Sequence, residues 1–402
     1  MCNAAVDGPG RIATREVGKI SSRSEAKKGG RDFLQSRSLL LSGRTGGCFL
    51  ICRWGGRLAS LQMEAVLKFC FAGFGHVHIY SLLEHVQTRQ DLEFVGACEG
   101  DPELAVKAGD RGVEVSYKNL EDALNDVEVD VVAIGAPFGL RGRLALEALA
   151  AGKHVISDKP LCTSLEELRE IEQLSRSNDL RLGCMLTMRD NPEMQSLRTY
   201  LKEGLIGEVH AIQFGGQHPL NAATRPQWYF EPGMHGGTIN DIFVHAADAI
   251  PWMTGLDWVS CLSARCWNAS CLDVPHFEDG AQMMLKMNNG CGVLGDVSYL
   301  MPSTGAYTLP YYWRMTMFGQ EGVVEVTEGN RSLTVTREGE IVPLQSVESD
   351  ERGYLDGFVN DVRGESAEDD LTTEGVIRAM DVALTIQQAA DYGRHGVSLT
   401  AD

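Results

Sequence analysis

The feature that most constrains this sequence is a strand, a glycine turn, a helix and a second strand in direct succession. Residues 66–72 form a continuous apolar run of strand length that leads into Gly73-Phe74-Gly75. Apolar residues then recur at helical spacing over 79–86, and a second apolar run over 92–98 ends in Glu99. This order of elements, with an acid about 20 residues after the turn, is typical of a dinucleotide-binding site.

The residue types in this stretch indicate which dinucleotide it would bind. Gly73 allows a tight turn, and Gly75 lets the backbone approach a pyrophosphate at the N-terminus of the helix. Glu99 can accept hydrogen bonds from both ribose hydroxyls, whereas it would repel a 2′-phosphate. Residues 100–103 contain no Lys or Arg to offset that charge. The sequence therefore favours NAD over NADP as the cofactor.

Strands and helices continue to alternate as far as residue 187, which predicts a doubly wound parallel sheet. The predicted strands cover 113–117, 129–134, 154–156 and 181–186, and the helices cover 120–125, 140–151 and a segment capped by Thr163 or Ser164. We therefore predict an N-terminal NAD-binding domain over residues 63–187.

The strand at 154–156 delivers Asp158-Lys159-Pro160 to its carboxyl end. Ligands of open parallel sheets bind just beyond those ends, so Lys159 is placed to meet a substrate. The alternative is an ordinary surface lysine that follows a strand, and this stretch alone does not decide between the two.

Beyond residue 187 strands dominate, which predicts a second domain over 188–402 with an open, mainly antiparallel sheet. A loop over 217–237 is rich in polar, aromatic and glycine residues. The predicted helices are 192–202, 238–254, 355–363 and 373–392, and the predicted strands are 258–267, 281–287, 292–299, 313–318, 322–326 and 333–337.

Charge is unevenly distributed along the chain. Residues 1–62 hold 11 Lys and Arg against 4 Asp and Glu, whereas the remainder holds 25 against 51. We expect residues 1–62 to be an extension that is disordered, a transit-type peptide, or the result of a start assigned upstream of Met63. The acidic remainder argues against nucleic acid or an anionic membrane as a partner.

The cysteines do not suggest a disulfide framework or a metal site. The chain has 11 of them, scattered and without a Cys-x-x-Cys pair. No apolar run approaches the length that spans a bilayer. We therefore expect a cytoplasmic protein without a bound metal.

The second domain contains a potential acid–base pair. Asp241 and His245 are four residues apart, which on a helix places them on one face together with Asp248. An acid beside an imidazole raises its basicity and orients it for proton transfer. Spacing alone favours the alternative, an ordinary Asp–His pair on a helix surface. Residues with the chemistry to bind a sugar-like ligand are Arg189, His218, Arg225, Trp228 and Tyr229.

Together these pieces resemble the Gfo/Idh/MocA oxidoreductases, the family of glucose–fructose oxidoreductase and inositol dehydrogenase. The resemblance covers residues 66 to 400 and rests on the joint order of several motifs rather than on any one. Its carriers are Gly73-Phe74-Gly75, Glu99, residues 129–137, residues 152–160 and residues 237–245.

The resemblance implies a Rossmann domain, a C-terminal α/β domain whose sheet commonly forms a homodimer or homotetramer, and sugar, cyclitol or polyol substrates. It implies Lys159, Asp241 and His245 as catalytic residues, with His245 the general base, Asp241 orienting it and Lys159 stabilising the oxyanion. The implied substrate-binding residues are Arg189, Arg225, Trp228, Tyr229, Asp241 and His245. The implied cofactor-binding residues are Gly73, Phe74, Gly75, His76, Val77, Glu99, Ala136, Pro137, Asp158 and Lys159.

Four residues depart from the family pattern. Asp158 stands where the family usually has Glu, and Phe138 and Arg141 stand where it often has Asn and His. Phe243 replaces a frequent glycine. These changes bear on the substrate class more than on cofactor binding. Two other functions fit the resemblance, an NAD-dependent glycosidase of the same fold and a non-catalytic sensor of NAD or a sugar.

Overall fold

The computed structural model describes residues 40–42, 48–54, 57–62, 65–346 and 353–400. The chain divides into two compact units, Met1–Glu64 and Ala65–Asp402. In the first unit, three strands form an antiparallel sheet in the order β1 (Leu40–Ser42), β2 (Cys48–Trp54) and β3 (Arg57–Gln62). These strands lie within residues 1–62, the segment that we expect to be an extension outside the two domains. The rest of residues 1–62, for which disorder or a targeting segment was expected, lies outside the described residues.

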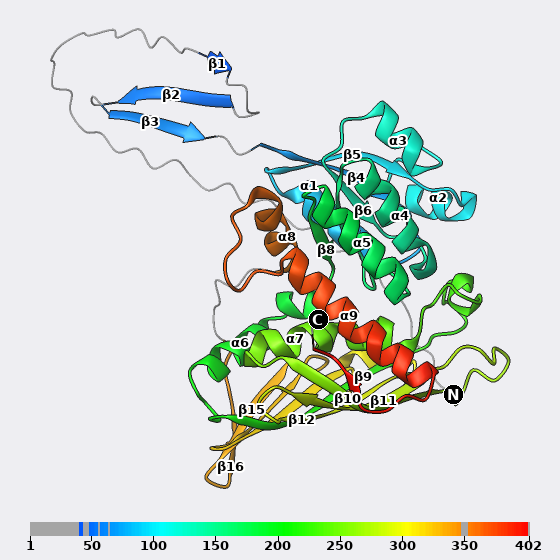
Figure 1. Ribbon diagram of the computed structural model, residues 1–402, viewed down its shortest axis with the longest axis vertical. Helices are drawn as coiled ribbons and strands as arrows, with labels where there is room; N and C mark the ends of the chain where they lie inside the picture. The colour runs from blue at the N-terminus through cyan, green and yellow to red at the C-terminus, as the bar shows by residue number, and fades with distance from the viewer. Residues whose placement is uncertain (1–39, 43–47, 55–56, 63–64, 347–352, 401–402) are drawn as a thin grey trace, which may run out of the picture. The chain divides into compact units, whose positions relative to one another are not determined.

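The first half of the second unit is built on a five-stranded parallel sheet (Figure 1). The strand order is β5-β4-β6-β7-β8, so the chain reverses its direction of travel between β4 and β6. Every residue of β6 is buried, as expected for a parallel sheet covered on both faces. The strands are β4 (Leu67–Ala72), β5 (Leu92–Cys98), β6 (Val131–Ile134), β7 (His154–Ser157) and β8 (Leu182–Cys184). The helices are α1 (His78–Thr88), α2 (Pro102–Gly109), α3 (Leu120–Asp126), α4 (Phe138–Ala150) and α5 (Leu165–Ser177).

The second half contains a nine-stranded sheet in the order β16-β15-β14-β13-β9-β12-β11-β10-β17. Burial alternates along β11, so one face packs on the core while the other is open. All described pairs are antiparallel except β9 with β12. The strands are β9 (Val209–Pro219), β10 (Trp258–Trp267), β11 (Gly280–Met287), β12 (Gly292–Met301), β13 (Trp313–Gly319), β14 (Val323–Thr327), β15 (Ser332–Arg337), β16 (Glu340–Pro343) and β17 (Val397–Ser398).

Helices fill the space between the two sheets. The long helix α9 (Thr373–Asp391) packs on β10 and α7 and also contacts α5 and β8 of the parallel-sheet half (Figure 1). The other helices are α6 (Pro192–Lys202), α7 (Val244–Thr254) and α8 (Tyr354–Arg363), with short turns η1 (Thr187–Asp190), η2 (Gln227–Phe230), the π-helical η3 (Ile239–Phe243) and η4 (Ala306–Thr308).

The structure corrects several element predictions. Residues 113–117 form no strand, because only Ser116 and Tyr117 bond to β5, with a single bridge from Tyr117 to Cys98. The start of the predicted 217–237 loop belongs to β9, whose paired Gly215 and Gly216 had hidden the strand pattern. The single helix predicted over 238–254 is divided into η3 and α7. The short strands β16 and β17 were not predicted.

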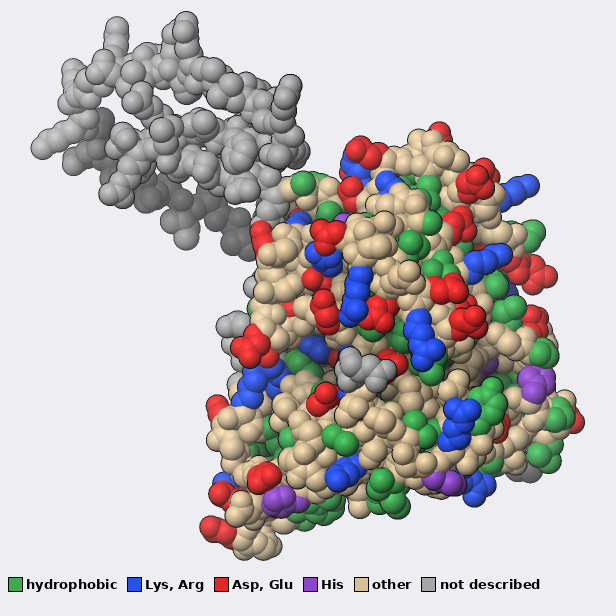
Figure 2. Space-filling view, viewed as in Figure 1, with side chains coloured by type: hydrophobic (Ala, Val, Ile, Leu, Met, Phe, Trp, Pro, Cys, Tyr) green, Lys and Arg blue, Asp and Glu red, His purple; other side chains and the backbone are tan. Residues whose placement is uncertain are grey.

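Charged side chains of both signs lie at the surface of the molecule. Figure 2 shows acidic and basic side chains interspersed over the visible face of the molecule. Within the described residues, no helix is both long and apolar enough to cross a membrane.

Candidate active site

The glycine turn after β4 packs closely against the turn after β6. Gly73 has a φ of 84°, a left-handed conformation that glycine adopts without strain. A Cβ built on Gly73 would lie 2.7 Å from Ala136, and one built on Gly75 would lie 2.6 Å from Pro137. The two glycines therefore let both turns meet at the point where the strand order reverses, which is where open α/β sheets bind ligands.

Glu99 is fixed at the end of β5 beside this turn. Its Oε2 accepts a hydrogen bond of 2.7 Å from the Phe74 backbone N–H, and its Oε1 accepts one of 3.0 Å from the Asp101 N–H. A cavity of about 510 Å³ opens here, and its lining includes Gly73, Glu99, Ala136, Pro137, Pro226 and Trp228. Six residues predicted to bind the cofactor, Gly73, Phe74, Gly75, Glu99, Ala136 and Pro137, thus come together.

This cavity suits a nicotinamide dinucleotide. It combines a glycine turn at the start of α1, where a pyrophosphate can be held, with a carboxylate placed to accept ribose hydroxyls. Val77, just before α1, is exposed, whereas His76 is buried. Lys107, Lys118 and Arg143 also line the cavity. All three lie outside residues 100–103, the segment whose lack of Lys and Arg favours NAD in the sequence.

Arg141 is fully buried and holds the turn that carries Lys159. Its Nη1 donates to the Asp158 carbonyl oxygen at 2.9 Å and also to the carbonyls of Lys159 and Pro160. Its Nη2 donates to Asp158 Oδ2 at 3.1 Å. This side chain therefore fixes both the backbone and the carboxylate of the turn after β7.

The Asp158 carboxylate also contacts two imidazoles of the glycine turn. His76 Nδ1 lies 2.6 Å from Oδ2, and His78 Nδ1 lies 3.3 Å from Oδ1. Burial alone would raise the pKa of Asp158, but His76, Arg141 and His78 outweigh it and hold that pKa well below its usual range. Two histidines and an acid can ligate a metal, and these atoms lie within 4.8 Å of one another. The Arg141 guanidinium already forms an ion pair with the Asp158 carboxylate, which a metal ion would have to share.

Lys159 forms a buried ion pair with Asp241 of η3. The Lys159 Nζ lies 2.6 Å from Asp241 Oδ1, and the two residues are 5% and 2% exposed. Burial alone would raise the pKa of Asp241, but the charge of Lys159 and contacts with His235 hold it well below its usual range. This ion pair joins the parallel-sheet half to the second half.

The second oxygen of Asp241 is bound by Tyr299 of β12. The Tyr299 hydroxyl donates to Asp241 Oδ2, and His235 Nε2 lies 2.8 Å from the same hydroxyl. Burial, together with the Asp241 charge, raises the pKa of Tyr299 well above its usual range, so this phenol acts as a donor. Tyr299 and His235 were not predicted, because Tyr299 is 58 positions from Asp241 and His235 lies before the predicted helix 238–254.

His245 lies in the same buried region but is not oriented by Asp241. No hydrogen bond between the two side chains is present in the described part of the chain, and the buried Nδ1 of His245 has no partner. Burial, followed by the charge of Lys159, holds the pKa of His245 well below its usual range, so the ring is neutral. The expected orientation of His245 by Asp241 is therefore absent from the described part of the chain, where Asp241 is bonded by Lys159 and Tyr299 instead.

Arg189 and Asp248 pair with each other instead of joining the Lys159 cluster. The Arg189 guanidinium donates to both carboxylate oxygens of Asp248, at 2.7 and 2.8 Å, and to the backbone oxygen of Asp369. The Cζ atom of the Arg189 guanidinium also lies 5.3 Å from the centre of the Trp252 ring. The structure thus places Arg189, predicted to bind substrate, in a buried ion pair that braces η1 against α7.

The other predicted substrate residues form an aromatic wall beside the site. Trp228 donates from Nε1 to the Gly75 carbonyl at 3.1 Å, which ties the 220–237 loop to the glycine turn. The Tyr229 ring lies 5.4 Å from Phe138 and 6.5 Å from Tyr299. Arg225 lies over Tyr229 at 4.7 Å. Burial lowers the pKa of His218, which lies 4.7 Å from Trp313, to about 3.

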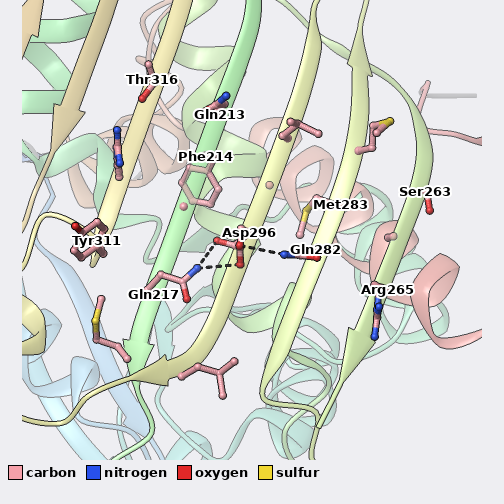
Figure 3. A pocket seen from close by; sticks show the side chains of 18 of the residues that line it. Gln213, Phe214, Gln217, Ser263, Arg265, Gln282, Met283, Asp296, Tyr311 and Thr316 are labelled. Carbon is pink, nitrogen blue, oxygen red and sulfur yellow. Dashed lines mark hydrogen bonds between the residues drawn. The ribbon is translucent and has the colours of Figure 1, made fainter. Parts of the chain in front are cut away.

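A second and larger cavity, of about 920 Å³, lies on the open face of the nine-stranded sheet. Figure 3 shows Gln217 and Gln282 directed toward Asp296, with hydrogen bonds of 3.0 and 3.2 Å to its carboxylate. The exposed side chains of Met284, Leu294 and Leu300 also line it. This cavity contains none of the residues of the Lys159 cluster.

Two family models match this chain in the order expected for two joined domains. Residues 67–185 match the oxidoreductase family with an NAD-binding Rossmann fold, and residues 194–325 match the GFO/IDH/MocA C-terminal domain. The chain belongs to the Gfo/Idh/MocA family. Its parallel sheet and its mainly antiparallel sheet are those of this family, as the sequence predicted.

Named relatives act on sugars, although the alignments span only about half of their length. Levoglucosan dehydrogenase of Pseudarthrobacter phenanthrenivorans is 29% identical over 39% of this chain and 41% of its own. The 1,5-anhydro-D-fructose reductase of Ensifer adhaerens is 32% identical over 46% of this chain and 55% of its own.

Solved structures share the fold at low identity. The aldose-aldose oxidoreductase of Caulobacter crescentus has a TM-score of 0.68 at 17% identity and covers 83% of this chain and 99% of its own. The WlbA dehydrogenase of Bordetella pertussis, solved with NADH and UDP-GlcNAcA, has a TM-score of 0.65 at 21% identity, over 84% of this chain and 100% of its own.

The buried Lys159–Asp241 pair yields a stability prediction. Replacing Asp241 with Asn would leave the Lys159 ammonium buried without its counter-charge, which costs about 3–5 kcal/mol of unfolding free energy. Urea denaturation of wild type and Asp241→Asn measures this loss. The control is the double variant Asp241→Asn with Lys159→Met, which removes the stranded charge and should recover part of it. Equal stability of wild type and the single variant would contradict the ion pair.

Proposed function

We propose that this protein is an NAD-dependent oxidoreductase that interconverts a carbinol and a carbonyl carbon of a sugar, cyclitol or related polyol. The observation that supports this best is the buried pair of Lys159 and Asp241 beyond the end of β7. Lys159 lies in the same half as the cavity lined by Gly73 and Glu99, and family membership connects the two features.

The reaction needs a hydride acceptor and a stabilised oxygen. NAD, when bound, supplies the hydride acceptor at nicotinamide C4. The Lys159 ammonium, fixed by Asp241, donates a hydrogen bond to the substrate oxygen and stabilises negative charge that develops there. Asp241 is itself held by the Tyr299 hydroxyl, so the donor keeps its position during the reaction. The family resemblance gives the hydroxyl proton to His245, a buried neutral imidazole.

The cofactor preference rests on Glu99. Backbone N–H groups of Phe74 and Asp101 hold its two oxygens, so the carboxylate is fixed at the cavity and disfavours a 2′-phosphate. The Lys107, Lys118 and Arg143 side chains lie along the same cavity and can balance the charge of a pyrophosphate. On these grounds we propose NAD over NADP.

The substrate class rests on the relatives and on the lining of the site. Levoglucosan dehydrogenase and 1,5-anhydro-D-fructose reductase are named for sugar derivatives. In this chain Tyr229, Phe138 and Trp228 form an aromatic wall, and sugar rings commonly pack their C–H faces on such rings. Arg225 adds donors beside Tyr229.

We also propose that the open face of the nine-stranded sheet joins two copies of the chain. Three exposed apolar side chains, Met284, Leu294 and Leu300, line one cavity on that face, and contiguous exposed apolar surface marks interaction sites. Arg265, Arg314 and Asp296 lie in the same lining, so a second copy can meet it with both charge signs.

Replacing Lys159 with Met should lower kcat by about 10²–10³-fold, because the donor to the developing oxyanion is lost. NADH formation is measured with NAD and a panel of aldoses, polyols and sugar acids. Lys68→Met on the surface is the matched control and should behave as wild type. An unchanged kcat in Lys159→Met would contradict the role of Lys159. Wild type that binds NAD but is silent on the whole panel would favour a sensor or a glycosidase.

Replacing Glu99 with Gln should reduce discrimination between the two dinucleotides. Wild type is expected to bind NAD at least about tenfold tighter than NADP, a difference of about 1.4 kcal/mol. Fluorescence titration measures both affinities in each variant. The matched control is Glu103→Gln in the same cavity lining, which should retain the preference. Equal binding of NAD and NADP by wild type would refute the assignment.

Replacing Leu294 with Arg should dissociate the proposed dimer, because it puts a charge into the apolar part of the sheet face. Light scattering after gel filtration should give the mass of at least two chains for wild type and of one chain for the variant. Leu272→Arg is the matched control, since Leu272 is 72% exposed and lies outside this cavity. A monomeric wild type would rule out the interface.

A further inference from the structure

One carboxylate and one imidazole in this site do form a short hydrogen bond, but they are not the pair at helical spacing. Asp158 follows β7, and His76 lies in the glycine turn before α1. Their Oδ2 and Nδ1 atoms are 2.6 Å apart, and the residues are 0% and 7% exposed. The turn after β4 and the turn after β7 thus contribute one residue each.

The Asp158 carboxylate is immobilised in its ionised form. Arg141 donates to Oδ2 at 3.1 Å and to the Asp158 backbone oxygen at 2.9 Å. The Arg141 side chain is itself fully buried and donates from Nε to the Ala136 carbonyl. Because an ionised carboxylate can only accept hydrogen bonds, each of its partners must be a donor.

This constraint fixes the tautomer of His76. The Nδ1 atom must carry the hydrogen that is donated to Asp158. Burial lowers the pKa of His76 to about 4 even though Asp158 opposes this shift, so the ring is neutral at pH 7. A neutral ring with its hydrogen on Nδ1 has an unprotonated Nε2, which is a proton acceptor.

The free nitrogen of His76 is available to a ligand. Among the described residues Nε2 makes no hydrogen bond, and it is not one of the buried polar atoms left without a partner. The His76 ring lies 5.5 Å from Phe138, and the Lys159 Nζ lies 5.8 Å from the same Phe138 ring. The His76 ring and the Lys159 ammonium therefore both lie beside the Phe138 ring.

His245 lacks this arrangement. Its Nδ1 is buried without a partner, and Asp241 is bonded by Lys159 and Tyr299 instead. No described carboxylate accepts a hydrogen bond from His245, so nothing comparable selects its tautomer or would stabilise the imidazolium after it accepts a proton.

From this comparison we propose that His76, oriented by Asp158 and Arg141, is a further catalytic residue that accepts the hydroxyl proton of the substrate. The proposal rests on the proposed oxidoreductase function and names its base. The O–H bond breaks and its proton bonds to Nε2, while the electron pair left on oxygen forms the second bond of the carbonyl. The hydride released from the same carbon goes to the oxidised nicotinamide dinucleotide. Asp158 then stabilises the imidazolium through Nδ1–H.

Several charged or titratable groups act on this imidazole. Asp158 favours its protonated form, whereas His78 and Lys159 disfavour it. The guanidinium of Arg141 bonds to the same Asp158 oxygen as His76. The centre of the Tyr229 ring lies 6.4 Å from that of the His76 ring. With a pKa of about 4, His76 is available as a base above that value. The oxidation rate should therefore show no loss attributable to this group between pH 6 and pH 5, and should fall only near pH 4.

The kinetic test compares His76→Gln with His245→Gln. His76→Gln should lower kcat for oxidation by about 10²–10⁴-fold at pH 7, with the loss shrinking as pH rises and hydroxide replaces the base. Fluorescence titration with NAD on the same variant separates the loss of kcat from any loss of cofactor binding. Arg141→Lys, which keeps one charged donor, should lose less than Arg141→Met. Wild-type kcat in His76→Gln, or a loss confined to His245→Gln, would overturn the proposal.

A second measurement does not depend on turnover. Histidine ¹⁵N spectra of the protein without cofactor should show His76, assigned by the loss of its signals in His76→Gln, as the Nδ1–H tautomer. Asp158→Asn should alter those signals but leave those of His245 unchanged. An Nε2–H tautomer in wild type would overturn the proposal whether or not any variant folds. If this tautomer is found but wild type oxidises no substrate of the panel, the proposed function fails, and the role of His76 in it fails as well.

Discussion

The buried ion pair between Lys159 and Asp241 is the interaction on which the rest of the site depends. Each charge would be costly without the other in a region that is almost free of solvent, so the pair holds only if both backbones are fixed. One backbone is the turn after β7, which Arg141 holds through its carbonyl groups. The other is η3, whose Asp241 is also bound by Tyr299. The two sheets are thereby joined at the point where the proposed chemistry takes place.

Patterns local in sequence were enough to predict the elements that form this frame. The apolar run before Gly73, the acid at Glu99 and the strand before Lys159 are each read from a few neighbouring residues, and the structure has all three elements. Elements whose pattern is weak were missed or misplaced. The paired glycines of β9 show no alternation, and residues 113–117 look like a strand although only Ser116 and Tyr117 bond to the sheet. A local sequence pattern indicates which segments tend to form strands. Which strands pair with each other is decided by residues that are distant in the sequence.

The partners of the site residues could not be predicted for the same reason. Tyr299 is 58 positions from Asp241, and His76 is 82 positions from Asp158. Helical spacing correctly brings Asp241 and His245 into one buried region, yet the hydrogen bonds of Asp241 come from Lys159 and Tyr299, which lie far away in the sequence. Spacing along a helix can show which side chains share a face. It cannot show which of them a residue from another strand will reach first.

Two departures from the family pattern are best understood as one change. Asp158 is shorter by one methylene than the usual glutamate, so its carboxylate stays close to its own backbone. Arg141, longer than the frequent histidine, can reach both that carboxylate and the carbonyl of the same residue, at 3.1 and 2.9 Å. Together the two residues form a buried Arg141–Asp158 ion pair, and breaking such a pair is strongly destabilising. The turn after β7 thus takes part in two buried ion pairs, Asp158 with Arg141 and Lys159 with Asp241. Because Asp158 and Lys159 have opposite charges, these two residues add no net charge to the interior.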